Sequence, residues 1–173
     1  MRAPLDIFRF TGEKYSQLLR DDGVFTWWDD MHAKLAFFRP ISALTHWIDH
    51  AWFAEQPWLM HLHSLLWAAV LLLGVLALYR EVLPDRFMCS LALALYALAD
   101  ARAWFVSWVA ARNATVATAF SVWALYLHVR QRKGSLPSGV WLAPLVLALA
   151  SCSGEGAIAT YAYLFVYALF VEE

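Results

Sequence analysis

The sequence predicts an all-α protein, a polytopic helical membrane bundle of about five hydrophobic helices with an amphipathic helix in its N-terminal loop. Hydrophobic residues make up 62% of the 173-residue chain and charged residues only 16%, against about 45–50% and about 25% in soluble domains. A core of this size could not bury so many apolar residues, which also gather in long runs. The composition excludes a disordered chain, a nucleic-acid-binding protein and a disulfide-stapled secreted module.

The distribution of charge divides the chain into two parts. Residues 1–57 hold eight acidic and six basic side chains, and we interpret them as a loop segment in water or at the membrane surface. Residues 58–173 hold six acidic and seven basic side chains, which cluster between apolar runs. This second part is the predicted transmembrane domain, and the net charge of the whole chain is −1.

Five apolar runs predict the hydrophobic helices. The strongest run, residues 58–79, is ~33 Å long as a helix, enough to cross a ~30 Å hydrocarbon core. Residues 87–99 form a shorter run, which we expect to be a helix shielded by its neighbours. The remaining runs are residues 113–129, 140–151 and 157–171, separated by the basic turn RQRKGSLPSG and by the segment SCSGEG.

The segment PISALTHWIDHAWF predicts an amphipathic helix over residues 41–53. Its apolar side chains recur with the spacing of one helical stripe: Leu44, Trp47, Ile48, Ala51 and Trp52. We expect this helix to lie flat on the outer membrane surface with its tryptophans among the lipid headgroups. The alternative is a helix that packs its apolar stripe into a soluble core.

His46, Asp49 and His50 lie on the other faces of the same segment. Two histidines four residues apart, with a carboxylate nearby, can hold a divalent metal ion. The pattern is a weak signal for a metal site, because two histidines also occur at this spacing by chance.

Lysine and arginine near the ends of the apolar runs predict the orientation. Five basic residues fall on one side: Arg80, Arg86, Arg130, Arg132 and Lys133. Three fall on the other: Arg39, Arg102 and Arg112. This bias predicts that residues 1–57 lie on the outer face. Because the first residues lack the pattern of a signal peptide, we expect an earlier membrane helix to be missing and the chain to be a portion of a longer protein.

Ionisable residues in the outer loop and at the outer helix ends are the candidate site. They are Asp29, Asp30, Asp100, Arg102, Arg112 and Glu155. Ionisable groups beside apolar spans are costly and mark functional sites. Arginine binds phosphate through two parallel hydrogen bonds, and a carboxylate can act as a general base. The alternative for each residue is a structural role, either as a helix cap or as a long side chain whose charged group extends from the membrane into water.

Four blocks of the sequence resemble, in the same order, bacterial GT-C-type membrane glycosyltransferases of the protein O-mannosyltransferase-like group. The blocks are KLAFFRPISALTHWIDH, PWLMHLHSLLW, WFVSWVAARNATVATAF and LALASCSGEGAI, and the similarity runs over about residues 25–171. FRPIS is similar to the block that ends the first outer loop of these enzymes. Trp108 and Arg112 match a W-x-x-x-R block, and Ser153-Gly154-Glu155 match an L-S-K-E block with Gly in place of Lys.

The resemblance implies transfer of a sugar from a polyprenyl-phosphate donor to an acceptor, at the outer face of a bacterial inner membrane. It implies Asp29 or Asp30 as the catalytic acidic residue, often with a divalent metal ion as cofactor. Arg102 and Arg112 are then expected to bind the donor phosphate, and Asp100 and Glu155 to be polar residues of the substrate site. No nucleic-acid partner is expected. The alternative function is a small non-catalytic integral membrane subunit that packs against partner helices.

Overall fold

The structure is a computed structural model that describes residues 8–10, 13–23, 26, 35–100 and 107–171. The described part of the chain is all-α, apart from one antiparallel pair between β1 (Arg9–Phe10) and β2 (Leu35–Ala36). Helix α1 (Glu13–Asp21) lies between these strands in the sequence. The predicted fold class is therefore confirmed as all-α.

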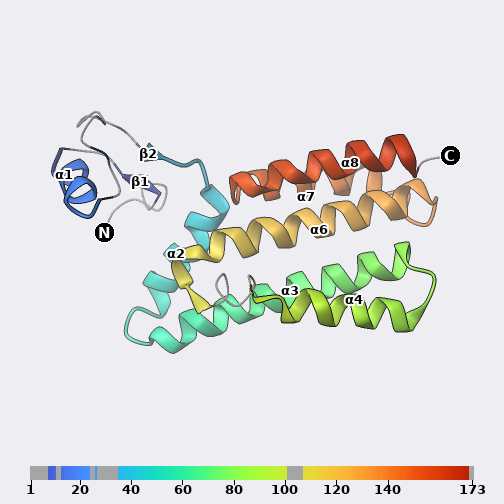
Figure 1. The fold of residues 1–173 in the computed structure, drawn as a ribbon, viewed down its shortest axis with the longest axis horizontal. Helices are drawn as coiled ribbons and strands as arrows, with labels where there is room; N and C mark the ends of the chain where they lie inside the picture. Colours follow the sequence, from blue (N-terminus) through green and yellow to red (C-terminus); the bar gives the residue numbers. More distant parts are fainter. Residues whose placement is uncertain (1–7, 11–12, 24–25, 27–34, 101–106, 172–173) are drawn as a thin grey trace.

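Five helices lie side by side in an elongated bundle (Figure 1): α3 (Pro57–Val82), α4 (Arg86–Leu98), α6 (Arg112–Arg132), α7 (Gly139–Ser151) and α8 (Ile158–Phe170). Helix α6 packs against α3 on one side and against α7 and α8 on the other. Short 3-10 turns, Val109–Ala111 and Glu155–Ala157, precede α6 and α8. Each of these five helices begins and ends within three residues of the bounds that the apolar runs predict, whereas α1 is not predicted.

Local sequence explains why the helices end where they do. Pro84 blocks continuation of α3, and the Asp85 carboxylate then caps α4 by accepting hydrogen bonds from the backbone N–H groups of Phe87 and Met88, at 3.1 and 3.3 Å. Gly134 has a φ of 71° in the turn between α6 and α7, a conformation that glycine adopts without steric cost.

Small residues let α3 and α6 approach each other closely. Gly74 of α3 faces the Trp123 ring of α6, and an added Cβ would lie only 2.9 Å from Trp123 Nε1. That nitrogen donates to the Val70 backbone O at 3.0 Å, which fixes the ring over the glycine. Leu71 and Val75 of α3 cluster with Ala119 of α6 beside this contact. The centre of the bundle is thus held by backbone proximity as well as by apolar burial.

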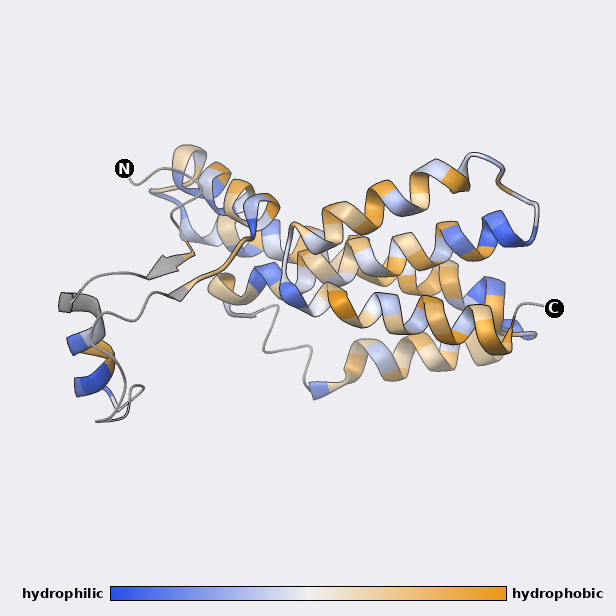
Figure 2. Cartoon of the chain, turned by 90° about the horizontal axis from the view of Figure 1, so that it is seen from above, coloured by the Kyte–Doolittle hydropathy of each residue, from blue (hydrophilic) through white to orange (hydrophobic). Residues whose placement is uncertain are grey.

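The outer sides of the bundle are apolar (Figure 2). Leu98, Trp141 and Phe170, on α4, α7 and α8, are 83%, 81% and 79% exposed. The expectation that the 87–99 helix is shielded by its neighbours is wrong for the described chain, because α4 packs against α3 and its other sides are open. In α4, Cys89 alone is buried.

Among the described helices, α3 alone is long and apolar enough to cross a membrane. Only 22% of its most apolar window is buried, so most of the apolar surface of α3 is open in the described structure. Helices α4, α7 and α8 have 13 residues each, or about 20 Å at 1.5 Å per residue.

Helix α2 (Pro40–Trp52) packs across one end of the bundle with its polar side inward (Figure 1). Its buried residues are Ser42, Ala43, Thr45, His46 and Asp49. The predicted apolar stripe faces outward instead, with Leu44 47% and Trp52 72% exposed. A helix that packs its apolar stripe into a soluble core would bury the opposite face, so α2 does not pack in that way within the described chain, and its place at a membrane surface stays a prediction.

Candidate functional site

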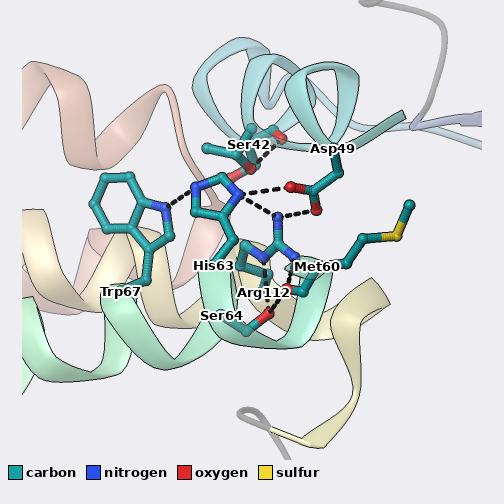
Figure 3. A network of polar contacts seen from close by, with 8 residues as sticks. Ser42, Asp49, Met60, His63, Ser64, Trp67 and Arg112 are labelled. Carbon is teal, nitrogen blue, oxygen red and sulfur yellow. Dashed lines mark hydrogen bonds and ion pairs between the residues drawn. The ribbon is translucent and has the colours of Figure 1, made fainter. Parts of the chain in front are cut away.

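A network of buried polar side chains joins α2 to the start of α3 and to the first residue of α6 (Figure 3). Burying a polar group costs free energy unless the group is hydrogen-bonded, and burying a charge costs more unless the charge is paired. The side chains at the centre of this network meet both conditions.

Arg112 lies at the centre of the network, where its side chain is fully buried. Its Nη1 donates a hydrogen bond to Asp49 Oδ2 and forms an ion pair with that carboxylate. Its Nε donates to Ser64 Oγ at 2.9 Å, and its Nη2 donates to the Met60 backbone O at 2.7 Å. One guanidinium therefore connects α6 to both α2 and α3.

The other oxygen of Asp49 contacts His63, whose Nδ1 lies 2.6 Å from Oδ1. The indole Nε1 of Trp67 donates to His63 Nε2 at 3.1 Å. Because an indole nitrogen can only donate, Nε2 must be the acceptor and the ring hydrogen lies on Nδ1, from which it is donated to Asp49. Both oxygens of the carboxylate are thus held, one by Arg112 and one by His63.

His46 lies on the buried side of α2, with 7% of its surface exposed. Burial and the nearby positive charge of Arg112 lower the pKa of His46 to about 4, against a smaller opposing effect of Asp49. His46 is therefore neutral at pH 7. Its ring contacts Phe8 edge-on, with the ring centres 5.8 Å apart.

A second cluster ties the start of α2 to the turn between α7 and α8. Arg39 Nε donates to both carboxylate oxygens of Glu155, at 3.1 and 2.8 Å. Its guanidinium also lies over the rings of Phe37 and Phe8, 4.4 and 5.2 Å from their centres. Burial raises the pKa of Glu155, but the hydrogen bond and charge of Arg39 outweigh that effect and the pKa is lowered.

Two further hydrogen bonds join the same segments. The backbone N–H of Ile41 donates to the Cys152 backbone O at 3.1 Å. The hydroxyl of Ser42 donates to the Ser153 backbone O at 2.6 Å, and both serines are buried. The FRPIS and SCSGEG segments, more than a hundred residues apart, are therefore in direct contact.

The structure brings only some of the predicted site residues together. Arg112 and Glu155 lie at the same end of the bundle but belong to the two separate clusters. Asp100 is exposed. Asp29, Asp30 and Arg102 lie outside the described residues, so their predicted roles stay predictions.

These contacts place the three residues of the predicted metal site in different environments. Asp49 binds Arg112 and His63, His46 is buried beside them, and His50 is exposed. In this arrangement each oxygen of Asp49 already has a hydrogen-bond partner. No group of three or more His, Cys, Asp or Glu side chains within the described ranges is placed to hold one, and a metal cofactor stays a prediction.

The sequence pattern misses the role of His63, Ser64 and Trp67. His63 and Trp67 are four residues apart, which places them on one face of α3. This spacing could have predicted their contact. Nothing in the pattern indicates that Arg112, 49 residues further on, reaches the same histidine.

Cavities in the described chain also lie outside the buried network. One of about 140 Å³ lies beside Arg39 and is lined by Phe8, Phe37 and Phe38. Another, of about 520 Å³, lies between the end of α3 and the start of α4. Comparisons with protein-family models, curated proteins and solved structures find no match to this chain.

Proposed function

We propose that this protein is a polytopic membrane glycosyltransferase of the GT-C type, which takes its sugar from a polyprenyl-phosphate donor at the outer face of a bacterial inner membrane. One observation carries the proposal. The four sequence blocks that resemble these enzymes fall in three separate regions of the chain, about residues 34–67, 104–120 and 147–158, yet their described parts meet at one end of the bundle. FRPIS contacts SCSGEG through Arg39 and Glu155, and the WIDH segment contacts the W-x-x-x-R block through Asp49 and Arg112.

The membrane location rests on the distribution of apolar surface. Helix α3 has the length and composition of a membrane span. The exposed sides of α4, α7 and α8 are apolar, and α2 turns its tryptophans outward while its polar face is bound to the bundle. Hydrocarbon around the helices and headgroups around α2 would match these surfaces. The shorter helices then depend on neighbouring helices or a thinned bilayer to complete their span.

In the proposed reaction, the carboxylate of Asp29 or Asp30 takes the proton of an acceptor hydroxyl. The hydroxyl oxygen then bonds to the anomeric carbon as the bond from that carbon to the phosphate oxygen breaks, and the polyprenyl phosphate leaves. Arg102 and Arg112 are the proposed phosphate partners, with Asp100 and Glu155 as polar residues of the same site. A phosphate that reaches Arg112 would have to replace Asp49, because the guanidinium is already paired.

A non-catalytic membrane subunit is the second candidate. The observation that favours it is the completeness of the buried network, in which Arg112 binds Asp49, Ser64 and Met60. Such a network explains the buried charges by packing alone, with no substrate.

Donor binding distinguishes the two functions. The purified protein in lipid vesicles is titrated with radiolabelled polyprenyl-phosphate mannose, with mannose 1-phosphate as the lipid-free comparison. We expect saturable binding of the lipid-linked donor and its loss in Arg112→Lys, which keeps the charge but not the paired geometry. Lys133→Gln, at the opposite end of the bundle, is the matched control and should bind as the wild type does.

The variants are first checked for membrane insertion and helix content. Wild-type donor affinity in Arg112→Lys would remove Arg112 from the donor site. Absence of binding by the wild type itself, across its stable pH range, would favour the subunit.

A further inference from the structure

The cavity of about 520 Å³ lies at the end of the bundle opposite the polar network. It is formed where α3 ends and α4 begins, and it is lined by both polar and apolar groups. Its lining includes Arg80, Arg86, Asp85, Leu76, Leu83 and Pro84. The two arginines are exposed.

Neither guanidinium has an acidic partner among the residues that the structure describes. Glu81, the acid beside Arg80, is paired with Lys133 and Arg130 of the α6 end, at 3.4 and 3.7 Å. Asp85, the acid beside Arg86, accepts the backbone hydrogen bonds that cap α4. The cavity lining therefore holds two positive charges and one carboxylate, that of Asp85, which caps α4, so its net charge is positive.

Exposed apolar side chains lie on the same two helices as the cavity, next to its lining residues in the sequence. Leu76 and Leu83 form part of its wall. Beyond the wall, Phe87 and Met88 are 69% and 52% exposed, and Leu73 of α3 is 60% exposed. A ligand that fills the cavity and follows these surfaces must be both anionic and hydrocarbon-rich.

We propose that this cavity binds the headgroup of an anionic phospholipid, with the phosphate between Arg80 and Arg86 and the acyl chains along α3 and α4. Basic pockets between membrane helices are suited to such headgroups, and the planar guanidinium matches the geometry of a phosphate. The inference depends on the proposed membrane location but not on glycosyl transfer, because it concerns the other end of the molecule.

The apolar wall argues for a lipid rather than a free anion. Inorganic phosphate would use only the two arginines and would leave the leucine surface against water, with no gain from its burial. A phospholipid covers both kinds of surface at once. It also remains in the leaflet that borders the end of α3, where its local concentration is high.

The test measures lipid binding to the purified protein in detergent by native mass spectrometry. Phosphatidylglycerol, phosphatidylcholine and inorganic phosphate are titrated separately. We expect one phosphatidylglycerol to bind with at least tenfold preference over phosphatidylcholine, and inorganic phosphate not to compete with it at millimolar concentration.

The variant Arg80→Gln/Arg86→Gln should lose roughly 10- to 30-fold in phosphatidylglycerol affinity, since each basic residue near a membrane surface contributes about a tenfold factor or less. The control Arg132→Gln removes one positive charge from the same end of the bundle, outside the cavity lining and without touching the Glu81–Lys133 pair, and should change affinity less than threefold. Arg80→Lys/Arg86→Lys keeps both charges but not the planar guanidinium, so its affinity should fall between those of the wild type and the glutamine variant.

Three outcomes would overturn the proposal. Equal binding of both phospholipids would mean that the phosphate charge is not recognised. Equal losses in the two glutamine variants would indicate attraction to the whole basic end rather than to the cavity. Competition by inorganic phosphate would make the site one for a soluble anion.

A single variant covers the case in which Arg80→Gln/Arg86→Gln does not fold. Unchanged affinity of Arg86→Gln for both phospholipids would then overturn the proposal.

Discussion

The two ends of α3 hold arginines in opposite environments. At its start, Arg112 of the neighbouring helix is buried and bound by a carboxylate, a hydroxyl and a backbone carbonyl. At its end, Arg80 and Arg86 are exposed beside a cavity, with no acidic partner within the described residues. A buried charge must be neutralised by its own protein and thereby becomes part of the fold. An exposed charge costs the fold little and is free to meet a ligand.

Removing one partner of the buried pair should have the largest effect. Arg112→Gln leaves the Asp49 carboxylate buried without its cation, and we expect it to lower the free energy of unfolding by about 3–5 kcal/mol. Arg80→Gln, the same substitution at the other end, should stay within about 0.5 kcal/mol of the wild type. Thermal unfolding in detergent, followed by circular dichroism, measures both.

The double variant Asp49→Asn/Arg112→Gln sharpens this result. It removes both charges, so it should recover part of the loss seen in Arg112→Gln. Equal stability of Arg112→Gln and Arg80→Gln would mean that the buried pair does not hold the bundle end together.

The second-largest effect should come from lowering the pH, which should reduce the free energy of unfolding through the end of the bundle that holds the buried polar network. The pKa of His46 is about 4 in the folded protein and about 6.5 when unfolded, so between these values the unfolded chain binds more protons. Stability is therefore complete above pH 6.5 and falls as the pH is lowered toward 4, by up to about 3 kcal/mol. Unfolding measured from pH 7.5 to 4 in the wild type and in His46→Gln gives the difference.

His46→Gln has no titrating group at this position, so its stability should fall less over the same range. His50→Gln is the matched control, because His50 is on the same helix but exposed. Parallel curves for the wild type and His46→Gln would show that His46 does not carry this pH dependence.

A smaller effect is expected midway between the two ends. Gly74→Ala places a methyl group 2.9 Å from Trp123 Nε1, and overpacking of this kind costs about 1–3 kcal/mol. Alanine is the better helix former by about 1 kcal/mol, so the net loss should be about 0–2 kcal/mol. Gly156→Ala is the control, because nothing lies within 4 Å of its added Cβ.

Thermal unfolding of Gly74→Ala and Gly156→Ala, each compared with the wild type, measures this loss of stability. Trp123 fluorescence alone would not, since the chain has ten tryptophans. A Gly74→Ala variant more stable than the wild type would show that the α3–α6 contact can widen without cost.

The sequence predicts the helices well and their contacts poorly. Long apolar runs bounded by Pro84 and by the RQRKGSLPSG turn are local signals, so they place helix ends within a few residues. The exposed sides of α4 could not be predicted in this way, because the number of neighbours around a helix is a property of the whole fold. Its apolar composition is equally suited to a protein interior and to lipid.

The same limit applies to the site. The stripe of α2 is correctly predicted, and Arg112 and Asp49 are both singled out by their residue types. Their pairing is not predicted, because a charge pattern gives a face of a helix but not the partner on another helix. His63 joins them only because α2 lies across the start of α3, an angle that no local pattern encodes.

The long sequence separations in the network set an order for biosynthesis. Asp49 leaves the ribosome 63 residues before Arg112, and Ser42 leaves it 111 residues before Ser153. At roughly 5–20 residues per second, the polar face of α2 waits about 3–13 seconds for Arg112 and about 6–22 seconds for Ser153. Asp49 can meet His63 after only 14 residues, but the partners that join α2 to α6 and to the turn before α8 come later, so α2 cannot complete its contacts with the bundle until that chain has been made.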